Sequence, residues 1–555
     1  MLTPAEEFVT QAFESGATDR AKIHELKLRY AAKYGRSPLA NVELISAYRN
    51  LVAKGKLAES REFVKLLRKR GVRSQSGIAS VTVITKAYPC PGRCIYCPSE
   101  PGMPKSYLSN EPAIMRAILN DFDSYKQTLN RLSSLNRSGH ETSKIEVIVA
   151  GGTFSFYPHR YQSDFTRGIF NALNAPMPPA RGLAAAQKLN EKASHRCIGL
   201  SFETRPDLIT EEELRRLRVL GCTKIEIGVQ SLNDKVLKLN KRDHGVAEVK
   251  RAIQLMRDSA YKINCHMMPN LYGSDVENDY RDFVELFENP AYRPDWLKVY
   301  PCMVVPWTAL QKIYEDGKFR PYTDEELGDL MVRIKSVVPE YCRITRLYRD
   351  IPSTSVIGGS KMSNLRQIVQ ARMKREGIKC RCIRCREIKG ERIAVENLTM
   401  NVREYEASGG KEFFISFDEK RGERGARAGS GLAGVESVGA GSVGDNGAPV
   451  CRLASLLRLR FSSYSLSGRK HFMKELEGAA LIREVHTYGE HVSVAGRPGA
   501  AAQHTGLGRR MMQKAEEISR SAGYKKIAVI SGVGVREYYR KLGYKLEGTY
   551  MVKKL

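Results

Sequence analysis

Three cysteines lie close together in a turn-rich stretch of the chain. The segment TKAYPCPGRCIYCPSEPG, residues 85–102, carries Cys90, Cys94 and Cys97 in the spacing CxxxCxxC. Three thiolates can hold three irons of a 4Fe–4S cluster and leave the fourth iron open to a substrate. Zinc is the competing metal, but a structural zinc site usually adds a fourth Cys or His nearby, and none follows here. Incidental core cysteines are disfavoured because the stretch is polar and rich in Pro and Gly.

A second group of cysteines lies in the basic segment CRCIRC. Cys380, Cys382 and Cys385 are compact enough to chelate one zinc ion, and the flanking Lys and Arg side chains would help to keep the thiols deprotonated. This spacing favours a structural zinc site over free thiols. The sequence does not identify a fourth ligand.

Glycines and polar residues stand at the ends of several predicted strands. Gly151 and Gly152, in the segment GGTF, would let a ligand approach the backbone closely, although a Gly-Gly turn needs no ligand. Glu203, Arg205 and Gln230 hold comparable positions at other strand ends. For these three residues a structural salt bridge or a capping role competes evenly with ligand contact.

The segment QHTGLGRRM, residues 503–511, opens a predicted helix with the pattern Q-x-x-G-x-G. The free N–H groups and the dipole at a helix N-terminus suit a pyrophosphate, and glycines permit close backbone approach. The candidate ligand-binding residues of this segment are Gln503, Gly506, Leu507, Gly508 and Arg509, and Arg510 adds positive charge.

Three more side chains near the C-terminus are candidates for chemistry. Tyr538 and Tyr539 are adjacent on a later predicted helix, where tyrosines usually pack in the core, so we expect one of the pair to be structural. Glu484 stands on a predicted strand in IREVH, as either a general base or a paired surface carboxylate.

The elements that would position these residues alternate between strands and helices from about residue 80 to residue 350. In TEEELRRLRVLG, Thr210 and Glu213 form a capping box. The alternation predicts an α/β fold with a parallel sheet and right-handed crossovers, either an open sheet or a full or partial TIM-type (β/α) barrel. Chemistry in such folds lies at the carboxyl ends of the strands. The predicted strand segments are VTVIT, KIEVIVAGGTF, CIGLSFETRPD, KIEIGVQS, KINCHMMP, WLKVYP and RITRLY.

The segments on either side of this region differ from it in composition. The N-terminal residues form a basic, amphipathic helical pattern that favours a substrate-gripping module. Residues 420–447 are rich in glycine and predict a flexible insertion. We expect a basic helical segment at 1–75, an α/β domain at 76–375, a zinc-binding linker at 376–394 and an α+β domain at 395–555.

Size and charge narrow the classes of function. The 555 residues contain 90 Lys and Arg against 61 Asp and Glu, a formal net charge of +29 that favours a polyanionic partner such as nucleic acid over adaptation for solubility. No apolar run approaches the roughly 18 residues of a membrane span, and the N-terminus is acidic where a signal peptide would be basic. A cytoplasmic location without membrane contact is expected, where most of the twelve cysteines would be thiols or metal ligands.

The CxxxCxxC segment, with Tyr96 before its third cysteine and a (β/α) pattern after it, resembles the radical S-adenosylmethionine superfamily. The resemblance implies that its three cysteines hold a 4Fe–4S cluster whose open iron binds S-adenosylmethionine. Reductive cleavage, with an electron donor, would then give a 5′-deoxyadenosyl radical. The residues implied for S-adenosylmethionine are Gly151 and Gly152, which would receive the methionine amino group, with Glu203 and Gln230.

The C-terminal segments resemble the Gcn5-related N-acetyltransferases. The Q-x-x-G-x-G turn, the strand KIAVIS and the helix EYYRKLGY together match the acetyl-CoA-binding pattern of that family. The resemblance implies that Gln503 to Arg509 hold acetyl-CoA and that Tyr538 or Tyr539 lies near the thioester sulfur.

The combination of the two patterns resembles the family of Elongator catalytic subunits in their single-chain archaeal or bacterial form. Matching segments run from about residue 70 to the C-terminus and include VIVAGGTFSFYP, FETRPD, VISGVGVREYYRKLGY and the terminal YMVKKL. The glycine-rich insertion is not a feature of that family, and it interrupts no motif. The resemblance implies modification of transfer RNA at carbon 5 of the wobble uridine. The radical would abstract hydrogen from the acetyl-CoA methyl group, the carbon radical would add to uridine, and thioester hydrolysis would leave a carboxymethyl group.

This function implies a set of partners and two rival functions. The basic helices and the second cysteine segment would bind the anticodon stem-loop, and His266, Lys298 and Tyr300 are candidate uridine contacts. A homodimer is the one assembly that we consider for the chain. The first rival function is protein or histone lysine acetylation with a structural cluster. The second is a nucleic-acid-binding protein that uses neither cofactor in catalysis.

Overall fold

The computed structural model describes residues 2–68, 77–389, 393–419, 451–489 and 506–555. The N-terminal part is helical, as predicted, and contains four helices whose apolar faces meet around residues such as Phe8, Leu44 and Phe63. Side chains of Thr3, Asp19 and Ser60 accept backbone N–H bonds at three of the helix N-termini. The four helices are α1 (Pro4–Glu14), α2 (Arg20–Lys33), α3 (Asn41–Ala53) and α4 (Arg61–Leu67).

Seven parallel strands form the first sheet, in the order of the chain. Neighbouring strands pair in sequence from the first to the last, and the two outer strands do not pair with each other. This confirms the predicted parallel sheet and selects its open, partial-barrel form. The strands are β1 (Ala79–Ile84), β2 (Lys144–Ala150), β3 (Arg196–Thr204), β4 (Lys224–Gln230), β5 (Lys262–Met267), β6 (Trp296–Val299) and β7 (Arg343–Arg346).

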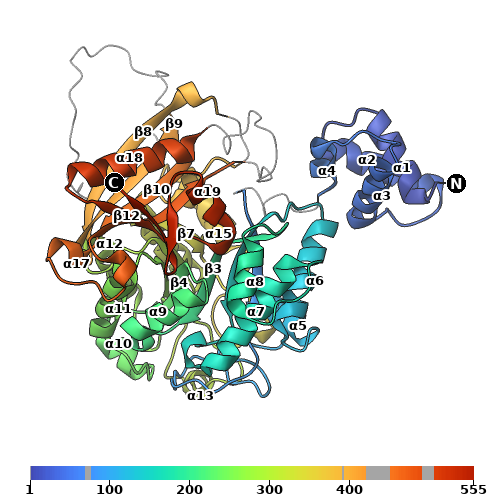
Figure 1. Cartoon of the computed structure of the whole chain (residues 1–555). Helices are drawn as coiled ribbons and strands as arrows, with labels where there is room; N and C mark the ends of the chain where they lie inside the picture. Colours follow the sequence, from blue (N-terminus) through green and yellow to red (C-terminus); the bar gives the residue numbers. More distant parts are fainter. Residues whose placement is uncertain (1, 69–76, 390–392, 420–450, 490–505) are drawn as a thin grey trace, which may run out of the picture.

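Helices cover the outer face of this sheet (Figure 1). Thr323 and Glu326 form a full capping box on one of them, whereas at Thr210 only the threonine side chain completes its half of the predicted box. The connecting helices are α5 (Pro112–Ile118), α6 (Ser124–Arg137), α7 (His159–Asn174), α8 (Leu183–Asn190), α9 (Glu211–Val219), α10 (Asp234–Leu239), α11 (Val246–Asp258), α12 (Val276–Glu288), α13 (Ala309–Glu315) and α14 (Asp324–Val337). Two further helices, α15 (Leu365–Arg375) and α16 (Ile383–Arg386), follow β7.

The two faces of the first sheet differ in chemistry. In β4, Ile225, Ile227 and Val229 point to the apolar core under the helices. The alternate residues of the same strand, Lys224 and Glu226, point to the inner face and are buried too. A parallel sheet covered on both sides normally carries apolar residues on both faces. Charged residues along the inner face therefore mark that face as the place for chemistry.

A second, mixed sheet follows the helix α16. Its order is β13-β14-β12-β11-β10-β9-β8, and only β11 and β12 pair in parallel. The chain crosses between these two strands through α18, and the long hairpin of β8 and β9 was not predicted. The elements are β8 (Leu398–Ala407), β9 (Gly410–Glu419), β10 (Leu453–Phe461), α17 (Ser463–Leu466), β11 (Ala479–Thr487), α18 (Leu507–Ser521), β12 (Lys526–Val529), α19 (Arg536–Arg540), β13 (Lys545–Glu547) and β14 (Tyr550–Lys554). The predicted insertion at 420–447 lies outside the described residues.

The second sheet docks on the amino ends of the first-sheet strands. Gly532 and Gly534 approach the backbone at the start of β3 so closely that a Cβ on Gly532 would lie 2.1 Å from the Ile198 carbonyl oxygen. Arg343, the first residue of β7, donates to the Tyr488 hydroxyl at 3.3 Å. At the point where the two sheets come closest, the glycine backbone after β12 thus lies directly against the backbone of β3, with no side chain between them.

Buried ion pairs fill the rest of this interface. Arg460 on β10 contacts Asp258 at the end of α11, and Arg483 on β11 contacts Asp295 immediately before β6. All four side chains are fully buried. Each carboxylate is therefore paired with an arginine of the second sheet, and Asp295 also has Arg257 of α11 at 3.9 Å.

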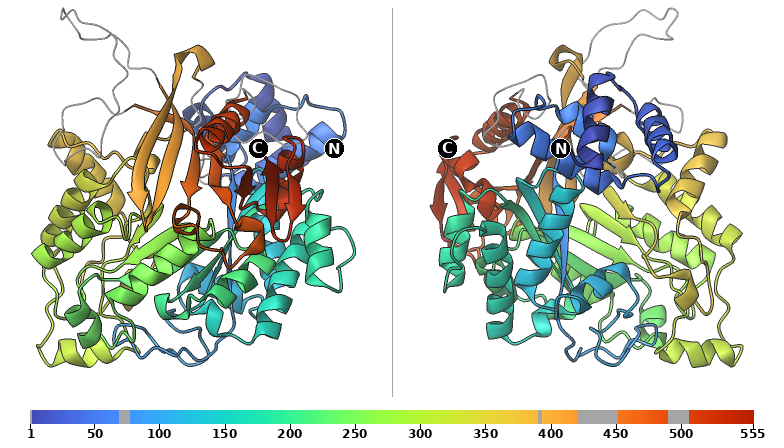
Figure 2. Two further views of the ribbon diagram at one scale, coloured as in Figure 1. Left: turned by 60° about the vertical axis from the view of Figure 1, so that its left-hand side comes forward. Right: turned by 90° about the vertical axis from the view of Figure 1, so that its right-hand side faces the viewer.

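The helical N-terminal part lies at the same end of the first sheet. Arg49 on α3 donates to the Asn136 carbonyl at the end of α6, at 2.8 Å. Figures 1 and 2 show α1–α4 and the second sheet toward one end of the molecule and helices α10 and α13 at the opposite end. In the described residues, none of the helices combines the length and the apolar character that a bilayer crossing needs.

Candidate functional site

The first three cysteines lie just beyond β1, in a loop across the carboxyl ends of the strands. Cys94 is buried, whereas Cys90 and Cys97 are half-buried. The Ile95 amide donates to the Asn240 carbonyl at 3.2 Å, and the Leu310 amide donates to the Ile95 carbonyl at 2.9 Å. These bonds fix the cysteine loop between the end of α10 and the start of α13.

Two guanidinium groups lie against this loop. Arg242 donates to Cys94 Sγ at 3.5 Å. The adjacent Cys97 thiol and the Arg242 charge lower the pKa of Cys94 to about 4, against the effect of burial. Arg205 has a buried Nη1 atom without a hydrogen-bond partner, at the place a Cβ on Gly92 would occupy. Three thiols beside two arginines fit an anionic iron–sulfur cluster, because both cations would offset its negative charge.

The two glycines after β2 differ in whether packing requires a glycine at their position. Gly151 and Gly152 have φ angles of 125° and 106°, which other residues rarely adopt. A Cβ on Gly151 would lie 2.2 Å from Thr85 Oγ1, so packing against β1 already requires this glycine. A Cβ on Gly152 would meet nothing nearer than the Lys105 carbonyl oxygen at 3.5 Å. Of the two, Gly152 leaves its backbone open to a ligand.

Two other predicted strand-end residues point in different directions. Arg205 forms a bidentate pair with Asp207 at 2.9 and 3.0 Å and supports the cysteine loop, so it does not face the inner side of the sheet. Gln230 ends β4 with a φ angle of 75°, and its Oε1 atom is buried without a hydrogen-bond partner. Gln230 therefore offers an unpaired acceptor at the carboxyl end of the sheet.

Glu203, Lys298 and His266 come together on the inner face, around a residue that had not been predicted. The Tyr107 hydroxyl donates to Glu203 Oε2 at 2.9 Å, and Lys298 Nζ lies 3.8 Å from Glu203 Oε1. Lys298 also donates to Glu226 Oε2, and His266 Nε2 lies 3.0 Å from the same oxygen. Glu226 thus joins the predicted residues into one cluster.

The charges of this cluster follow from its burial. Burial opposes ionisation of Glu226, but Lys298 and Lys224 hold its pKa well below its usual range. Burial also disfavours the Lys298 cation, yet Glu226 raises the pKa of Lys298. For His266, burial and the Lys298 charge lower the pKa. At neutral pH the cluster therefore holds an ionised carboxylate, an ammonium group and a neutral imidazole.

A metal ion would compete with this lysine. Ligand atoms of Glu203, Glu226 and His266 all lie within 4.8 Å of one another, as in a metal site. The Lys298 ammonium already neutralises Glu226 and faces Glu203. The group is therefore an ion-pair cluster that contains its own cation.

Charged contacts continue along the inner face toward the second sheet. Lys224 Nζ lies 3.6 Å from Glu226 Oε1 and 4.2 Å from the centre of the Trp296 ring. Lys262 approaches the same ring at 5.7 Å and pairs with Glu484 of β11 at 3.9 Å. A polar chain thus connects the carboxyl end of the first sheet with the second sheet.

Sequence reasoning missed Glu226 and its neighbour Glu146, which Lys224 contacts at 2.8 Å. Both glutamates lie in segments that read KIE, at 144–146 and 224–226. A charged residue at every second position of an otherwise apolar parallel strand was the available signal, because it places the charge on one face.

The second cysteine group gathers where α16 begins. The sulfur atoms of Cys380, Cys382 and Cys385 all lie within 4.8 Å of one another. Lys335 donates to Cys385 Sγ at 3.6 Å, and the other two thiols together with Lys335 lower the pKa of Cys385. The thiol set fits a zinc ion. Within the described ranges, no fourth Cys, His, Asp or Glu joins it.

The predicted pyrophosphate-binding helix is α18. Gly506 precedes it with a φ angle of 76°, and among the described residues no side chain caps its first turn. The N–H groups of this turn are therefore available to an anion. Leu507 is buried, whereas Arg509 is exposed. Gln503 lies outside the described residues.

The two adjacent tyrosines occupy different environments. Tyr539 is only 6% exposed and belongs to the apolar core of the second sheet. Tyr538 is 39% exposed, and its hydroxyl lies 3.0 Å from the place of a Cβ on Gly508. Tyr538 therefore faces the start of α18, and Tyr539 is the structural member of the pair.

Glu484 is not a free general base. Arg458 donates to its Oε2 atom at 2.8 Å, and Lys262 faces its other oxygen. Although burial opposes ionisation, these cations lower the pKa of Glu484 to about 2. Glu484 is therefore a paired carboxylate, as one of the two predictions had it, but it is buried and does not lie at the surface.

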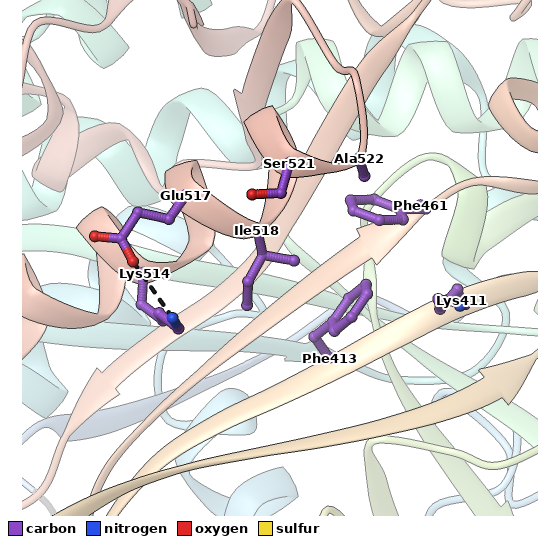
Figure 3. A pocket seen from close by; sticks show the side chains of 8 residues that line it. All are labelled: Lys411, Phe413, Phe461, Lys514, Glu517, Ile518, Ser521 and Ala522. Atoms are coloured by element: carbon purple, nitrogen blue, oxygen red, sulfur yellow. Dashed lines mark hydrogen bonds and ion pairs between the residues drawn. The ribbon is translucent and has the colours of Figure 1, made fainter. Parts of the chain in front are cut away.

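A pocket of about 590 Å³ lies over the other half of α18 (Figure 3). Phe413, Phe461 and Ile518 form its apolar floor, and Lys514 pairs with Glu517 at 3.4 Å on one wall. This pocket is separate from Gly506 and from the start of the helix, so it does not belong to the predicted pyrophosphate site.

Sequence comparison identifies the family of the first sheet and the segment after it. Residues 84–285 match the Radical SAM superfamily, and residues 294–375 match the Radical_SAM C-terminal domain. The first match includes Glu203, Glu226 and His266, and the second includes Lys298.

Whole-chain relatives extend the comparison to the second sheet. A tRNA uridine(34) acetyltransferase of Methanocaldococcus infernus is 40% identical over 90% of this chain and 89% of its own length. One of Dehalococcoides mccartyi is 40% identical over 87% of this chain and 99% of its own length. Elongator complex protein 3 of Homo sapiens is 37% identical over 96% of this chain and 93% of its own length.

A solved structure has the same fold. The archaeal Methanocaldococcus infernus Elp3 with an N-terminal deletion (1–46) superposes with a TM-score of 0.71 at 36% identity. The match covers 86% of this chain and 100% of that chain.

Proposed function

The chain belongs to the family of the tRNA uridine(34) acetyltransferases and Elongator complex protein 3, and we propose that it modifies carbon 5 of uridine 34 in transfer RNA. It is a radical S-adenosylmethionine enzyme and an acyltransferase. The group that we propose to be added is carboxymethyl, derived from acetyl-CoA. The observation that carries the proposal is the buried polar inner face, whose charged contacts run from Glu203 at the carboxyl end of the first sheet to Glu484 of the second sheet.

The cysteine loop is the proposed cluster site. Cys90, Cys94 and Cys97 would hold a 4Fe–4S cluster, and Arg242 and Arg205 would offset its charge. With S-adenosylmethionine bound, such a cluster supplies reducing chemistry that generates a carbon-centred radical. The residues proposed to bind S-adenosylmethionine are Gly152, Glu203 and Gln230, with Gly151 shaping the turn.

The start of α18 is the proposed acetyl-CoA site. Strands β11 and β12 pair only as far as Ile482 and Val529, after which β11 continues to Thr487 paired with β10 alone. The uncapped first turn of α18 would bind the pyrophosphate through its N–H groups. Tyr538, whose hydroxyl faces this turn, would contact the thioester end.

The inner face is the proposed reaction chamber. His266 and Lys298 would contact the uridine base, and Lys298 would remain charged because it is paired with Glu226. Burial of these groups excludes bulk water, which would otherwise quench a reactive intermediate. The acetyl group and the base would meet there from the second-sheet side.

Three further partners belong to this proposal. The basic helices α1–α4 would bind the transfer RNA anticodon arm. A pocket of about 330 Å³ beside the cysteine loop would receive an acidic electron donor, because its lining carries more cations than anions: Arg93, Lys238, Lys241 and Arg242 against Asp234 and Asp243. Zinc at the second cysteine group would be structural. A cytoplasmic location and a homodimer stay predictions.

One reconstitution tests this function. The anaerobically purified protein is incubated with transfer RNA, dithionite, S-adenosylmethionine and acetyl-CoA, and the nucleosides are analysed by mass spectrometry. We expect carboxymethyl-type uridine from the wild type and from the control Cys451→Ala, and none from Cys94→Ala. Absence of the product from protein with a full iron content would refute the proposal.

Protein lysine acetylation is not favoured. The whole-chain relatives at about 40% identity are named for uridine 34 of transfer RNA. An acetyltransferase for lysine would also have no use for the cysteine loop and the ionised inner face. Acetyl transfer to lysine without S-adenosylmethionine would reverse this choice.

A further inference from the structure

The Glu226 carboxylate orients its neighbours in addition to balancing their charge. Glu226 is 1% exposed and stands in the middle of β4. Its Oε2 atom accepts from both His266 and Lys298, while its Oε1 atom accepts from Ser201 at 3.3 Å. A single buried carboxylate therefore fixes two neighbouring side chains at once.

The carboxylate determines which ring nitrogen of His266 carries the proton. An ionised carboxylate can only accept hydrogen bonds, so the Nε2 atom that faces it must be the N–H group. A second proton on the ring would place a new cation beside the Lys298 ammonium on the same oxygen. The ring is therefore neutral and has its lone pair on Nδ1.

The Nδ1 atom is free to accept a hydrogen bond. Among the described residues it has no partner, and the side chain is 12% exposed toward the inner face. The Tyr300 ring stands edge-on to the imidazole, with the ring centres 5.6 Å apart. The Tyr300 hydroxyl has no hydrogen bond within the described ranges either. Lys298 lies next to both, 5.8 Å from the Tyr300 ring centre.

We infer that His266, held in one tautomer by Glu226, selects uracil by accepting the N3–H proton of the target base. This inference rests on the proposed function and adds how the base is read. The Watson–Crick edge of uracil presents an acceptor, a donor and an acceptor, O4, N3–H and O2. Lys298, His266 Nδ1 and the Tyr300 hydroxyl present a donor, an acceptor and a donor.

The same three groups reject cytosine. The N3 atom of cytosine is an acceptor, so it would face the Nδ1 lone pair without a proton between them. Its exocyclic amino group would also meet the Lys298 ammonium, donor against donor. Two unpaired contacts in a buried site cost far more binding than one lost hydrogen bond. Glu226 is a positioning residue in this arrangement, because it acts through His266.

Binding measurements test the selection. Anticodon stem-loop RNAs that differ only in U34, C34 or N3-methylated U34 are titrated against the full chain by fluorescence anisotropy. We expect the wild type to bind the U34 RNA at least about tenfold more tightly than the other two. His266→Ala should reduce this ratio to about one, mainly by weakening U34. The exposed His159→Ala is the matched control and should keep the wild-type ratio.

Nitrogen-15 NMR of labelled histidine tests the tautomer. Of the ten histidines, the His266 signal is identified by its loss in His266→Ala. At neutral pH, we expect an unprotonated Nδ1 and a protonated Nε2. In Glu226→Gln the amide can both donate and accept, so we expect a mixture of tautomers together with a smaller U34 preference. Melting temperatures of both variants separate this effect from misfolding.

Three results would overturn the inference. The first is an equal affinity of the wild type for the U34 and C34 RNAs. The second is a U34 preference that remains unchanged in folded His266→Ala protein. The third is a wild-type His266 that is doubly protonated or carries its proton on Nδ1. None of these measurements requires a reduced cluster or product formation. Failure of the uridine reading is therefore distinguishable from failure of the proposed reaction.

Discussion

The buried pair between Arg460 and Asp258 gives the sharpest test of how the two sheets hold together. Arg460 donates to Asp258 Oδ1 from Nε at 2.9 Å and from Nη2 at 2.5 Å. Ser463 adds its hydroxyl to Asp258 Oδ2 at 2.6 Å. Both members of the pair are fully buried. Arg460 also contacts the buried Glu412 at 3.2 Å, whereas Asp258 has no other cationic partner within the described ranges.

The expected magnitudes follow from this burial. Either Asp258→Asn or Arg460→Met should lower the free energy of unfolding by about 3 to 5 kcal/mol, the usual cost of breaking a buried pair on one side. The double variant should cost about 2 kcal/mol or more less than the sum of the singles, because neither member of the pair remains as a charge and Glu412 keeps Arg483 at 2.9 Å. Asp350→Asn is the control, since its partner Arg346 is exposed and the loss should stay below about 1 kcal/mol.

Chemical denaturation measures the losses in the free energy of unfolding, and differential scanning calorimetry measures the number of unfolding transitions. Because Asp258 belongs to the first sheet and Arg460 to the second, the single variants should also split one transition into two. The reasoning is refuted if both single variants lose less than about 1 kcal/mol, or if the two losses add without coupling. Either result would mean that water reaches the interface.

Three other predictions concern the metal, the ligand and acid. Cys382→Ser should remove bound zinc, measured by metal analysis, and lower the melting temperature; retention of a full equivalent would exclude the second cysteine group as the site. Tyr538→Phe should reduce acetyl-CoA turnover and leave the melting temperature unchanged. Tyr539→Phe should lower the melting temperature and leave turnover unchanged; equal effects of the two variants would contradict the assignment of Tyr538 to the ligand and Tyr539 to the core. Because Glu484 has a folded pKa of about 2, below its usual 4.5, its stabilisation of about 3 kcal/mol is present above pH 4.5 and is lost as the pH falls toward 2. Glu484→Gln should remove that acid-dependent loss, measured as melting temperature against pH.

The sequence was sufficient to predict the strands of the first sheet and to name polar residues at their carboxyl ends. Alternating strand and helix patterns located all seven strands of the first sheet, because buried parallel strands have a strong local signal. The cysteine groups were equally visible, since their spacing is local. His266 and Lys298 could be named from strand ends, although their common partner could not.

Residues that depend on long-range pairing were the ones missed. Glu226 matters because the register of β4 with β5 and β6 brings it to His266 and Lys298, and no local pattern encodes that register. Long-range contacts also decide the role of Glu484, which was predicted as either a general base or a paired surface carboxylate and which Arg458 and Lys262 hold as a buried ion-pair partner. Tertiary contacts decide the charge state, and with it the role.

The opposed placement of the cysteine loop and the second sheet has a kinetic consequence. A reductant that docks near Arg93 approaches the end of the first sheet that carries α10 and α13, while the helices α1–α4 and the second sheet occupy the other end (Figure 1). The electron donor and the transfer RNA would then not exclude each other. In steady-state kinetics, the apparent KM for transfer RNA should not rise as the concentration of the electron donor is increased. Either of the two could bind first.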